Sequence, residues 1–136
     1  SSEVWGGFRV AKRAKIISLQ ESEDTIEATH DGYKSIGAYH SRSFHKSKTN
    51  FVIEDRVESR RGHKIETFLN FHPDCRLNIS GSCIEIGSEL TINLENANSI
   101  ALEDYNYSVG FNKTVKATKI RALVEQDSRI TITSIA

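Results

Sequence analysis

Residue types that can perform acid–base, metal or sugar chemistry gather between Thr29 and Pro73. The densest cluster is His30-Asp31-Gly32-Tyr33. A histidine, a carboxylate and a phenol so close together form half of a metal site, or an acid/base pair beside a ring that stacks on a sugar. The simpler interpretation is an Asp-Gly turn that connects two strands and carries polar side chains.

A second group follows in Tyr39-His40-Ser41-Arg42-Ser43-Phe44. In a strand, the side chains of His40 and Arg42 project from one face, because successive side chains alternate. An imidazole beside a guanidinium can hold a carboxylate, with the arginine bidentate. The alternative is a solvated strand face. We take Tyr33, His40 and Arg42 as the candidate substrate-binding residues.

Other candidates are separated or ambiguous. His63 opens one expected strand and His72 closes it, so at about 3.3 Å per residue they lie roughly 30 Å apart and cannot share a site. Tyr105 and Tyr107 share a strand face. They form either a platform for sugar rings or half of a core layer.

Cys75 and Cys83 are the only cysteines. A turn at Ser80-Gly81 makes Ile79 and Ser82 its closing pair, which leaves the two sulfurs out of line with each other. We therefore predict two free thiols. Neither cysteine has the neighbouring Cys or His ligands of a structural zinc site.

Alternation of apolar and polar residues with period two dominates the chain and indicates β-strands. One example is Ile65-Glu66-Thr67, and we also expect a strand over Val10 to Lys15. Turn signals separate the strands at intervals of roughly 8–12 residues. They are Asp31-Gly32, Arg61-Gly62, Pro73-Asp74, Ser80-Gly81, Gly87-Ser88, Asn96-Ala97-Asn98 and Gln126-Asp127-Ser128. This pattern predicts an all-β fold, an antiparallel two-sheet β-sandwich of about a dozen strands.

The expected core consists of apolar residues on the inward faces of these strands. They are Phe8, Ile16, Ile26, Phe44, Phe51, Ile53, Val57, Ile65, Leu69, Phe71, Leu90, Ile92, Ile120 and Ile132.

Chain length, net charge and the absence of known motifs exclude several classes of function. The 136 residues fit one domain, 1–136, and the formal net charge is zero. No long-range field therefore attracts nucleic acid or a membrane surface, although a local patch can still meet an acidic polysaccharide. No nucleotide-binding glycine motif, metalloprotease motif or serine-hydrolase motif is present. The chain lacks methionine and a signal peptide, and we interpret it as part of a longer polypeptide.

Several segments together resemble the C-terminal β-domain of the heparinase II/III-like polysaccharide lyases. In order, they are residues 2–14, His30-Asp31-Gly32-Tyr33, the strand from His40 to Phe44, Glu54-Asp55-Arg56-Val57, Phe71-His72-Pro73 and residues 107–133. Each motif alone is weakly specific. Their order and spacing, which span nearly the whole chain, carry the resemblance.

The resemblance implies a role beside a separate catalytic domain. Members of this family join an upstream α/α toroid to a β-sandwich and cleave uronic-acid-containing polysaccharides by β-elimination. That reaction requires the uronate carboxylate to be neutralised, the C5 proton removed and the leaving oxygen protonated. The family's residues for these steps lie upstream of this chain, so no catalytic residue is assigned here. We expect the domain to support one wall of the cleft and to be inactive alone.

The same resemblance implies that His30 is a zinc ligand in the longer protein, with the other ligands upstream. The isolated domain is expected to hold no cofactor. A typical family member is periplasmic. The alternative function is a non-catalytic carbohydrate-binding module with exposed coplanar aromatic rings, or a structural module with a large apolar patch.

Overall fold

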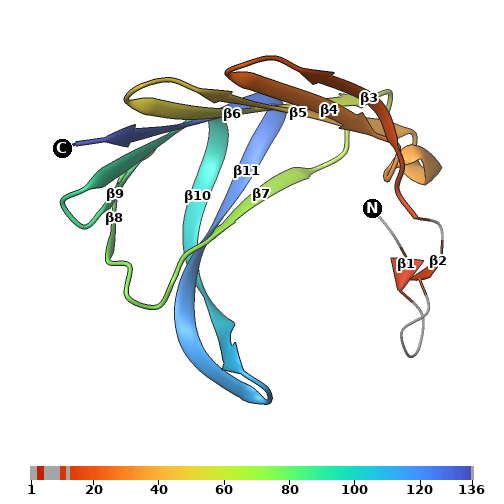
Figure 1. Ribbon diagram of the computed structural model, residues 1–136. Helices are drawn as coiled ribbons and strands as arrows, with labels where there is room; N and C mark the ends of the chain where they lie inside the picture. Colours follow the sequence, from red (N-terminus) through yellow and green to blue (C-terminus); the bar gives the residue numbers. More distant parts are fainter. Residues whose placement is uncertain (1–2, 5–9, 12, 136) are drawn as a thin grey trace.

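The computed structural model describes residues 3–4, 10–11 and 13–135, and most of them lie in antiparallel strands (Figure 1). A single 3-10 turn, η1, interrupts them. The elements are β1 (Glu3–Val4), β2 (Val10–Ala11), β3 (Ile16–Glu21), β4 (Thr25–His30), η1 (Lys34–Ile36), β5 (Ala38–Lys46), β6 (Asn50–Ser59), β7 (Ile65–Asn70), β8 (Leu77–Ser80), β9 (Cys83–Ile86), β10 (Leu90–Gly110) and β11 (Lys113–Ser134). The prediction of an antiparallel all-β fold is confirmed.

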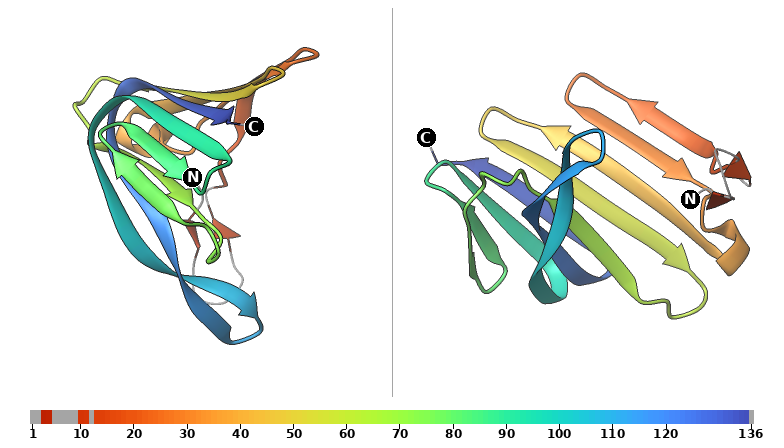
Figure 2. Two further views of the ribbon diagram at one scale, coloured as in Figure 1. Left: turned by 90° about the vertical axis from the view of Figure 1, so that its left-hand side faces the viewer. Right: turned by 90° about the horizontal axis from the view of Figure 1, so that it is seen from below.

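Nine of the eleven strands in the described residues form one continuous sheet, where the sequence predicts a sandwich of two sheets. Eight of these strands follow the order β3-β4-β5-β6-β11-β10-β9-β8, the ninth strand, β7, pairs with β11 off this path, and β1 and β2 make a separate pair. Layering arises because β10 and β11 are very long and bend. The middle of β11, Lys119 to Val124, pairs with β7 and its last part pairs with β6, so one strand belongs to both layers (Figures 1 and 2).

The bend occupies two segments that the sequence analysis takes for turns, and both of those predictions are wrong. Asn96-Ala97-Asn98 lies inside β10 and Gln126-Asp127-Ser128 inside β11. The register shifts between Glu95 and Ala97, and Asn96 adopts a left-handed φ of 59°. Asparagine tolerates this conformation better than most residues. The turn-forming residues therefore bulge the ribbon without reversing the chain.

The register of the β8–β9 hairpin differs by one residue from the predicted one, in which Ile79 and Ser82 close the turn. Ser80 pairs with Cys83, so the turn residues are Gly81 and Ser82, and Gly81 has a φ of 61°. Only glycine adopts that conformation without steric cost, which places it first in the two-residue turn. Both cysteines are free thiols, as predicted. The strand expected over Val10 to Lys15 is limited to β2, because residues 13–15 lie outside any strand.

The core lies where the bent ribbon folds under the β6 side of the sheet. Its buried residues are Ile53, Ile84, Ile92, Leu94, Ile120, Ala122, Val124 and Ile130. Predicted core residues that are buried or pack against this cluster are Phe44, Ile53, Ile65, Leu69, Phe71, Ile92, Ile120 and Ile132. Val57 and Leu90 are half-buried outside the cluster, and Phe8 lies outside the described residues.

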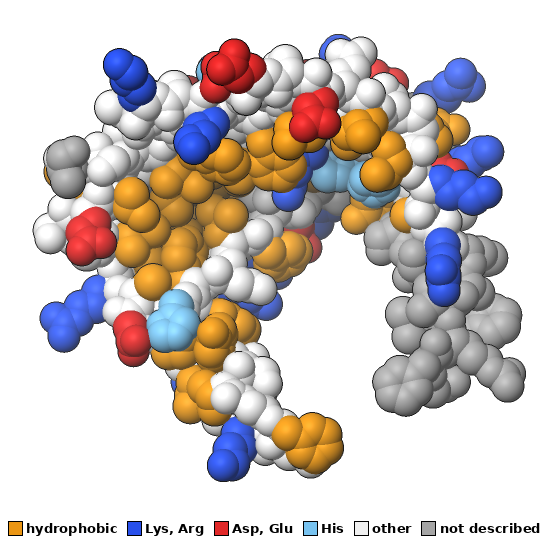
Figure 3. Space-filling model, viewed as in Figure 1, with side chains coloured by type: hydrophobic (Ala, Val, Ile, Leu, Met, Phe, Trp, Pro, Cys, Tyr) orange, Lys and Arg blue, Asp and Glu red, His pale blue; other side chains and the backbone are white. Residues whose placement is uncertain are grey.

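Three predicted core residues are exposed, and this finding shows how far the lower layer extends. Ile16, Ile26 and Phe51 are 65%, 45% and 37% exposed. Ile26 pairs with Phe44 on the inward face of β4, but no element in the described part of the chain covers that face there. Figure 3 shows the resulting shape. Hydrophobic side chains gather in a hollow beneath the upper strands, and pale-blue histidine side chains lie under the same strands towards the right of the view.

Candidate functional site

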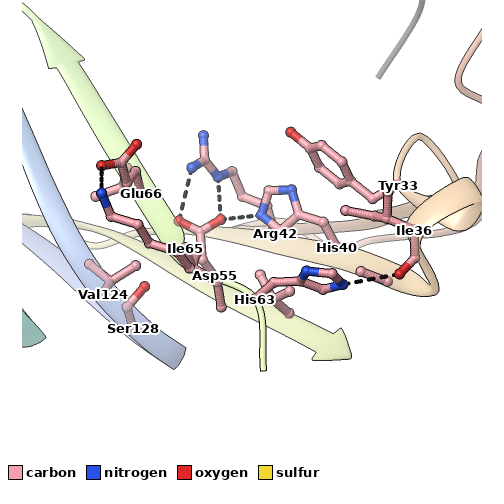
Figure 4. A pocket seen from close by; sticks show the side chains of 14 residues that line it. Tyr33, Ile36, His40, Arg42, Asp55, His63, Ile65, Glu66, Val124 and Ser128 are labelled. Atoms are coloured by element: carbon pink, nitrogen blue, oxygen red, sulfur yellow. Dashed lines mark hydrogen bonds and ion pairs between the residues drawn. The ribbon is translucent and has the colours of Figure 1, made fainter. Parts of the chain in front are cut away.

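A pocket of about 190 Å³ opens where the covered half of the sheet meets the uncovered half (Figure 4). Strands β5 and β6 form its upper wall, and the start of β7 forms the opposite wall. Apolar side chains from both walls line it, among them Val57, Ile65 and Val124. The polar lining includes Tyr33, His40, Arg42 and Asp55, so the pocket collects the three candidate substrate-binding residues.

Asp55 is the centre of the polar half of this pocket. Its side chain lies on the inward face of β6 and is only 8% exposed as a residue. The Nε and Nη2 atoms of Arg42 donate to its two carboxylate oxygens at 2.6 and 2.9 Å. His40 Nε2 lies 2.6 Å from Oδ1. The carboxylate that His40 and Arg42 were expected to hold is therefore supplied by the protein itself.

A chain of hydrogen bonds continues from His40 to the turn after β4. His40 Nδ1 lies 3.1 Å from His30 Nε2, and the backbone N–H of Gly32 donates to His30 Nδ1 at 3.1 Å. Because Nδ1 of His30 accepts, a neutral His30 carries its proton on Nε2 and donates it to His40. His40 then carries its own proton on Nε2 and donates it to Asp55. With both rings neutral, each ring nitrogen of His30 and His40 has a hydrogen-bond partner.

The environment shifts two pKa values in this network. Burial tends to raise the pKa of Asp55, but the hydrogen bonds from His40 and Arg42 outweigh it and hold the pKa below its usual value. Burial lowers the pKa of His30, and the nearby His40 lowers it further. Asp55 is therefore ionised and His30 neutral near pH 7.

The turn that carries Tyr33 is held from two sides. Asp31 Oδ1 accepts from the backbone of Lys15, and His63 Nε2 lies 3.0 Å from the carbonyl oxygen of Ile36. Tyr33 is 42% exposed, and its ring centroid lies 5.5 Å from that of His30. The Asp-Gly turn is confirmed, and it places an aromatic ring at the edge of the pocket (Figure 4).

The structure brings His30, Tyr33, His40 and Arg42 together, and His63 joins them in the pocket while His72 lies elsewhere. His40 and Arg42 lie half-buried on the inward side of β5, where both contact Asp55. His63 lines the pocket, whereas the ring of His72 packs against Tyr107. These two histidines do not share a site, as expected.

Tyr105 and Tyr107 serve packing. The Tyr105 hydroxyl donates to the carbonyl of Phe71 at 2.6 Å, and Tyr107 meets the His72 ring edge-on. Both side chains are half-buried where residues 71–72 approach β10 and β11.

Asp55 is the functional residue that sequence reasoning missed. A usable signal was present, because Phe51, Ile53, Asp55 and Val57 fall on one strand face at period two. A carboxylate in such an apolar row points inward and needs a partner. Its partners, His40 and Arg42, also lie two residues apart in the sequence and so share one strand face.

The zinc prediction for His30 stays a prediction. In the part of the chain that the structure describes, no three His, Cys, Asp or Glu side chains are grouped so that they could hold a metal ion. Both ring nitrogens of His30 are engaged in hydrogen bonds. Zinc at His30 therefore requires ligands from beyond the described residues and the release of one of these bonds.

No helix among the described residues is long and apolar enough to cross a membrane.

Comparisons with solved structures and with a family model show what this chain is similar to. No curated protein matches the chain. Among solved structures, heparinase III, the BT4657 gene product, matches with a TM-score of 0.66 and 15% identity, over 90% of this chain and 21% of that one. Heparan sulfate lyase HepC from Pedobacter heparinus matches with a TM-score of 0.61 and 14% identity, over 90% of this chain and 22% of that one. At these identities the likeness shows the fold, and the chain spans about a fifth of the length of these neighbours.

The family model described as "Heparinase II/III-like, C-terminal" matches residues 1–135, essentially the whole chain. The segments that carried the resemblance are therefore parts of one continuous match. This chain belongs to the heparinase II/III-like C-terminal domain family.

Proposed function

We propose that this chain is the C-terminal domain of a polysaccharide lyase that cleaves uronic-acid-containing polysaccharide by β-elimination. In this role it supports one wall of the substrate cleft, next to an α/α toroid of the same polypeptide, and is inactive alone. The observation that carries the proposal is the family match over residues 1–135. The similar solved structures are named as heparinase III and heparan sulfate lyase, and this chain covers only 21% and 22% of their lengths.

The pocket supports this assignment through its chemistry. It combines an exposed tyrosine ring at its edge, a guanidinium held in a fixed orientation and an apolar wall. Aromatic rings and arginine forks are the groups that bind sugar rings and carboxylates. Among the described residues of this pocket, both ring nitrogens of His40 are already engaged, so His40 is not available as a proton acceptor. The site thus favours binding over catalysis.

The test is an assay for the ultraviolet absorbance of unsaturated uronate products. We expect no product when the 136-residue chain alone is incubated with uronic-acid-containing polysaccharides. The longer polypeptide, with its toroid, should form product from at least one of them. Activity from the chain alone would contradict the proposal, and so would an upstream region without helical toroid structure.

The zinc prediction belongs to the same longer protein. We propose that His30 contributes one ligand there, together with upstream residues. Elemental analysis of the longer polypeptide, with and without His30→Ala, tests this. The variant should contain less zinc per chain, and equal zinc contents would refute the assignment.

A further inference from the structure

Arg42 has two usable hydrogen-bonding edges, and Asp55 occupies only one of them. Nε and Nη2 face the carboxylate of Asp55. The remaining donors, Nη1 and the second N–H of Nη2, form the end-on edge of the guanidinium. Nη1 has no hydrogen-bond partner among the described residues, and Figure 4 shows it pointing away from Asp55. The side chain is 39% exposed and lines the pocket.

We propose that this end-on edge of Arg42 is the anion-recognising element of the pocket and receives one carboxylate or sulfate group of an acidic saccharide. The choice of a saccharide rests on the proposed function. Within the site, Arg42 contacts the anion, and Tyr33 lies beside the sugar ring. Asp55 and His40 orient the guanidinium and do not touch the ligand.

The hydrogen bonds of His40 remove it from the list of ligand contacts. Its Nε2 lies against Asp55 and its Nδ1 against His30. A neutral imidazole has only these two polar atoms, so none is left for a saccharide. His40 and Arg42, which share one strand face, therefore have different roles: Arg42 contacts the anion, and His40 helps to orient Arg42 through Asp55.

The charge balance limits the site to a single anionic group. Asp55 offsets the charge of Arg42, and Lys64 pairs with Glu66 at 2.8 Å on the opposite wall. Among the described lining residues, no other lysine or arginine is present. Recognition therefore depends on the planar fork of Arg42 more than on long-range attraction, and lysine cannot replace it.

The experiment is an NMR titration of the ¹⁵N-labelled 136-residue chain with three matched probes. They are a uronate-containing tetrasaccharide, its neutral carboxyl-reduced form, and the sulfated form of that reduced sugar. We expect at least one anionic probe to bind about tenfold more tightly than the neutral one, as one charge-assisted bidentate contact provides. Preference for the uronate identifies a carboxylate subsite, and preference for the sulfated probe identifies a sulfate subsite.

Variants separate contact from orientation. Arg42→Lys should reduce the anionic preference to about twofold or less, because an ammonium lacks the fork. His40→Gln should retain the preference, since its amide can donate to Asp55 in place of Nε2. The matched control is Arg129→Lys on the other face of the sheet, where Arg129 pairs with Glu54 and is 49% exposed. This control should keep the full preference.

The outcomes distinguish this proposal from the proposed function. Equal binding of all three probes, with shifts at Tyr33, would overturn the role of Arg42 while leaving a saccharide pocket. Loss of the preference in His40→Gln would overturn the division of roles in which Arg42 alone recognises the anion. If none of the probes shifts Tyr33 or its neighbours, both the anion subsite and the proposed contact with polysaccharide are wrong.

Discussion

Asp55 accepts hydrogen bonds from two side chains of the neighbouring strand, His40 and Arg42. It is one of the few charged or polar residues that are buried in the described part of the chain. Removing one partner from such a network leaves the other groups without compensation, which costs more than the net value of the network. Asp55 therefore controls both the stability of this region and the orientation of Arg42.

We expect Asp55→Asn to lower the free energy of unfolding by about 2 kcal/mol, because the amide cannot replace a charged acceptor for the guanidinium. The control is Glu54→Gln. Glu54 directly precedes Asp55 in β6 and lies on the other face of the strand. Its side chain is 48% exposed beside Arg129. An exposed pair of this kind contributes less than about 1 kcal/mol. Urea unfolding monitored by circular dichroism measures both, and equal losses would contradict the buried role of Asp55.

The pH dependence of stability follows from His30. Its folded-state pKa lies below the ordinary value of 6.5, because burial and His40 disfavour the charged ring. Below that pH the unfolded chain binds more protons than the folded chain. The stability that neutral His30 provides is thus complete above pH 6.5 and is lost as the pH falls through the folded pKa. Protonated Asp55 removes a further contribution at more acidic pH, since its folded pKa is also lowered.

Urea midpoints at pH 7 and pH 5 test this dependence. The urea midpoint of the wild-type protein should be lower at pH 5 than at pH 7. His30→Gln should show a smaller decrease, because glutamine does not titrate in this range. His72→Gln is the control, since the His72 side chain is 53% exposed at the end of a strand. A wild-type protein whose stability is constant over this range would contradict the account.

At the scale of elements, the bend in β10 and β11 decides the layering. Asn96 sits at the bend with a positive φ, and its side-chain Nδ2 donates to the carbonyl of Asp127 at 2.8 Å. The hydrogen bond connects the two bulged segments of the ribbon. Strand β7 can then pair with the middle of β11 beneath the strands that pair with its last part.

We expect Asn96→Ala to destabilise the fold by about 2 kcal/mol, through the steric cost of a left-handed alanine and the lost hydrogen bond. Asn96→Gly removes the steric cost but not the hydrogen-bond loss, so its stability should fall between alanine and wild type. Asn98→Ala, at an exposed position nearby, is the control and should change little. Thermal unfolding measures the order, and a glycine variant less stable than alanine would contradict it.

At the scale of the whole molecule, the core is one-sided. The bent ribbon, β7 and the β8–β9 hairpin cover the inward face near β6, while no element among the described residues covers that face under β3 and β4. Ile120 is fully buried and Ile26 is 45% exposed, although both belong to inward-facing strand positions. Alternation alone cannot distinguish these two isoleucines.

The same substitution at both positions tests this asymmetry. Ile120→Ala should lower the free energy of unfolding by about 3 kcal/mol, as expected for a core isoleucine that leaves a cavity. Ile26→Ala should cost less than about 1 kcal/mol, mainly through weaker strand propensity. Denaturant unfolding gives both values. A cost at Ile26 close to that at Ile120 would mean that the open face is covered.

The local features of this protein could be predicted from its amino-acid sequence. Period-two alternation predicted the strands, Asp31-Gly32 predicted the turn that carries Tyr33, and the spacing of His40 and Arg42 placed them on one face. These features depend on backbone geometry and near neighbours, so a one-dimensional pattern records them. Motif order also sufficed to indicate the family.

Only the tertiary structure decided what each face meets. Asp55 is fifteen residues from His40, and their contact depends on the register between β5 and β6. The turn-like segments around Asn96 and Asp127 became a bend because two long strands pair through them. Burial depends on which strands lie across the sheet, and that arrangement is set by contacts between residues far apart in the chain. The open edge of Arg42 is a product of this register, since Asp55 takes the other edge.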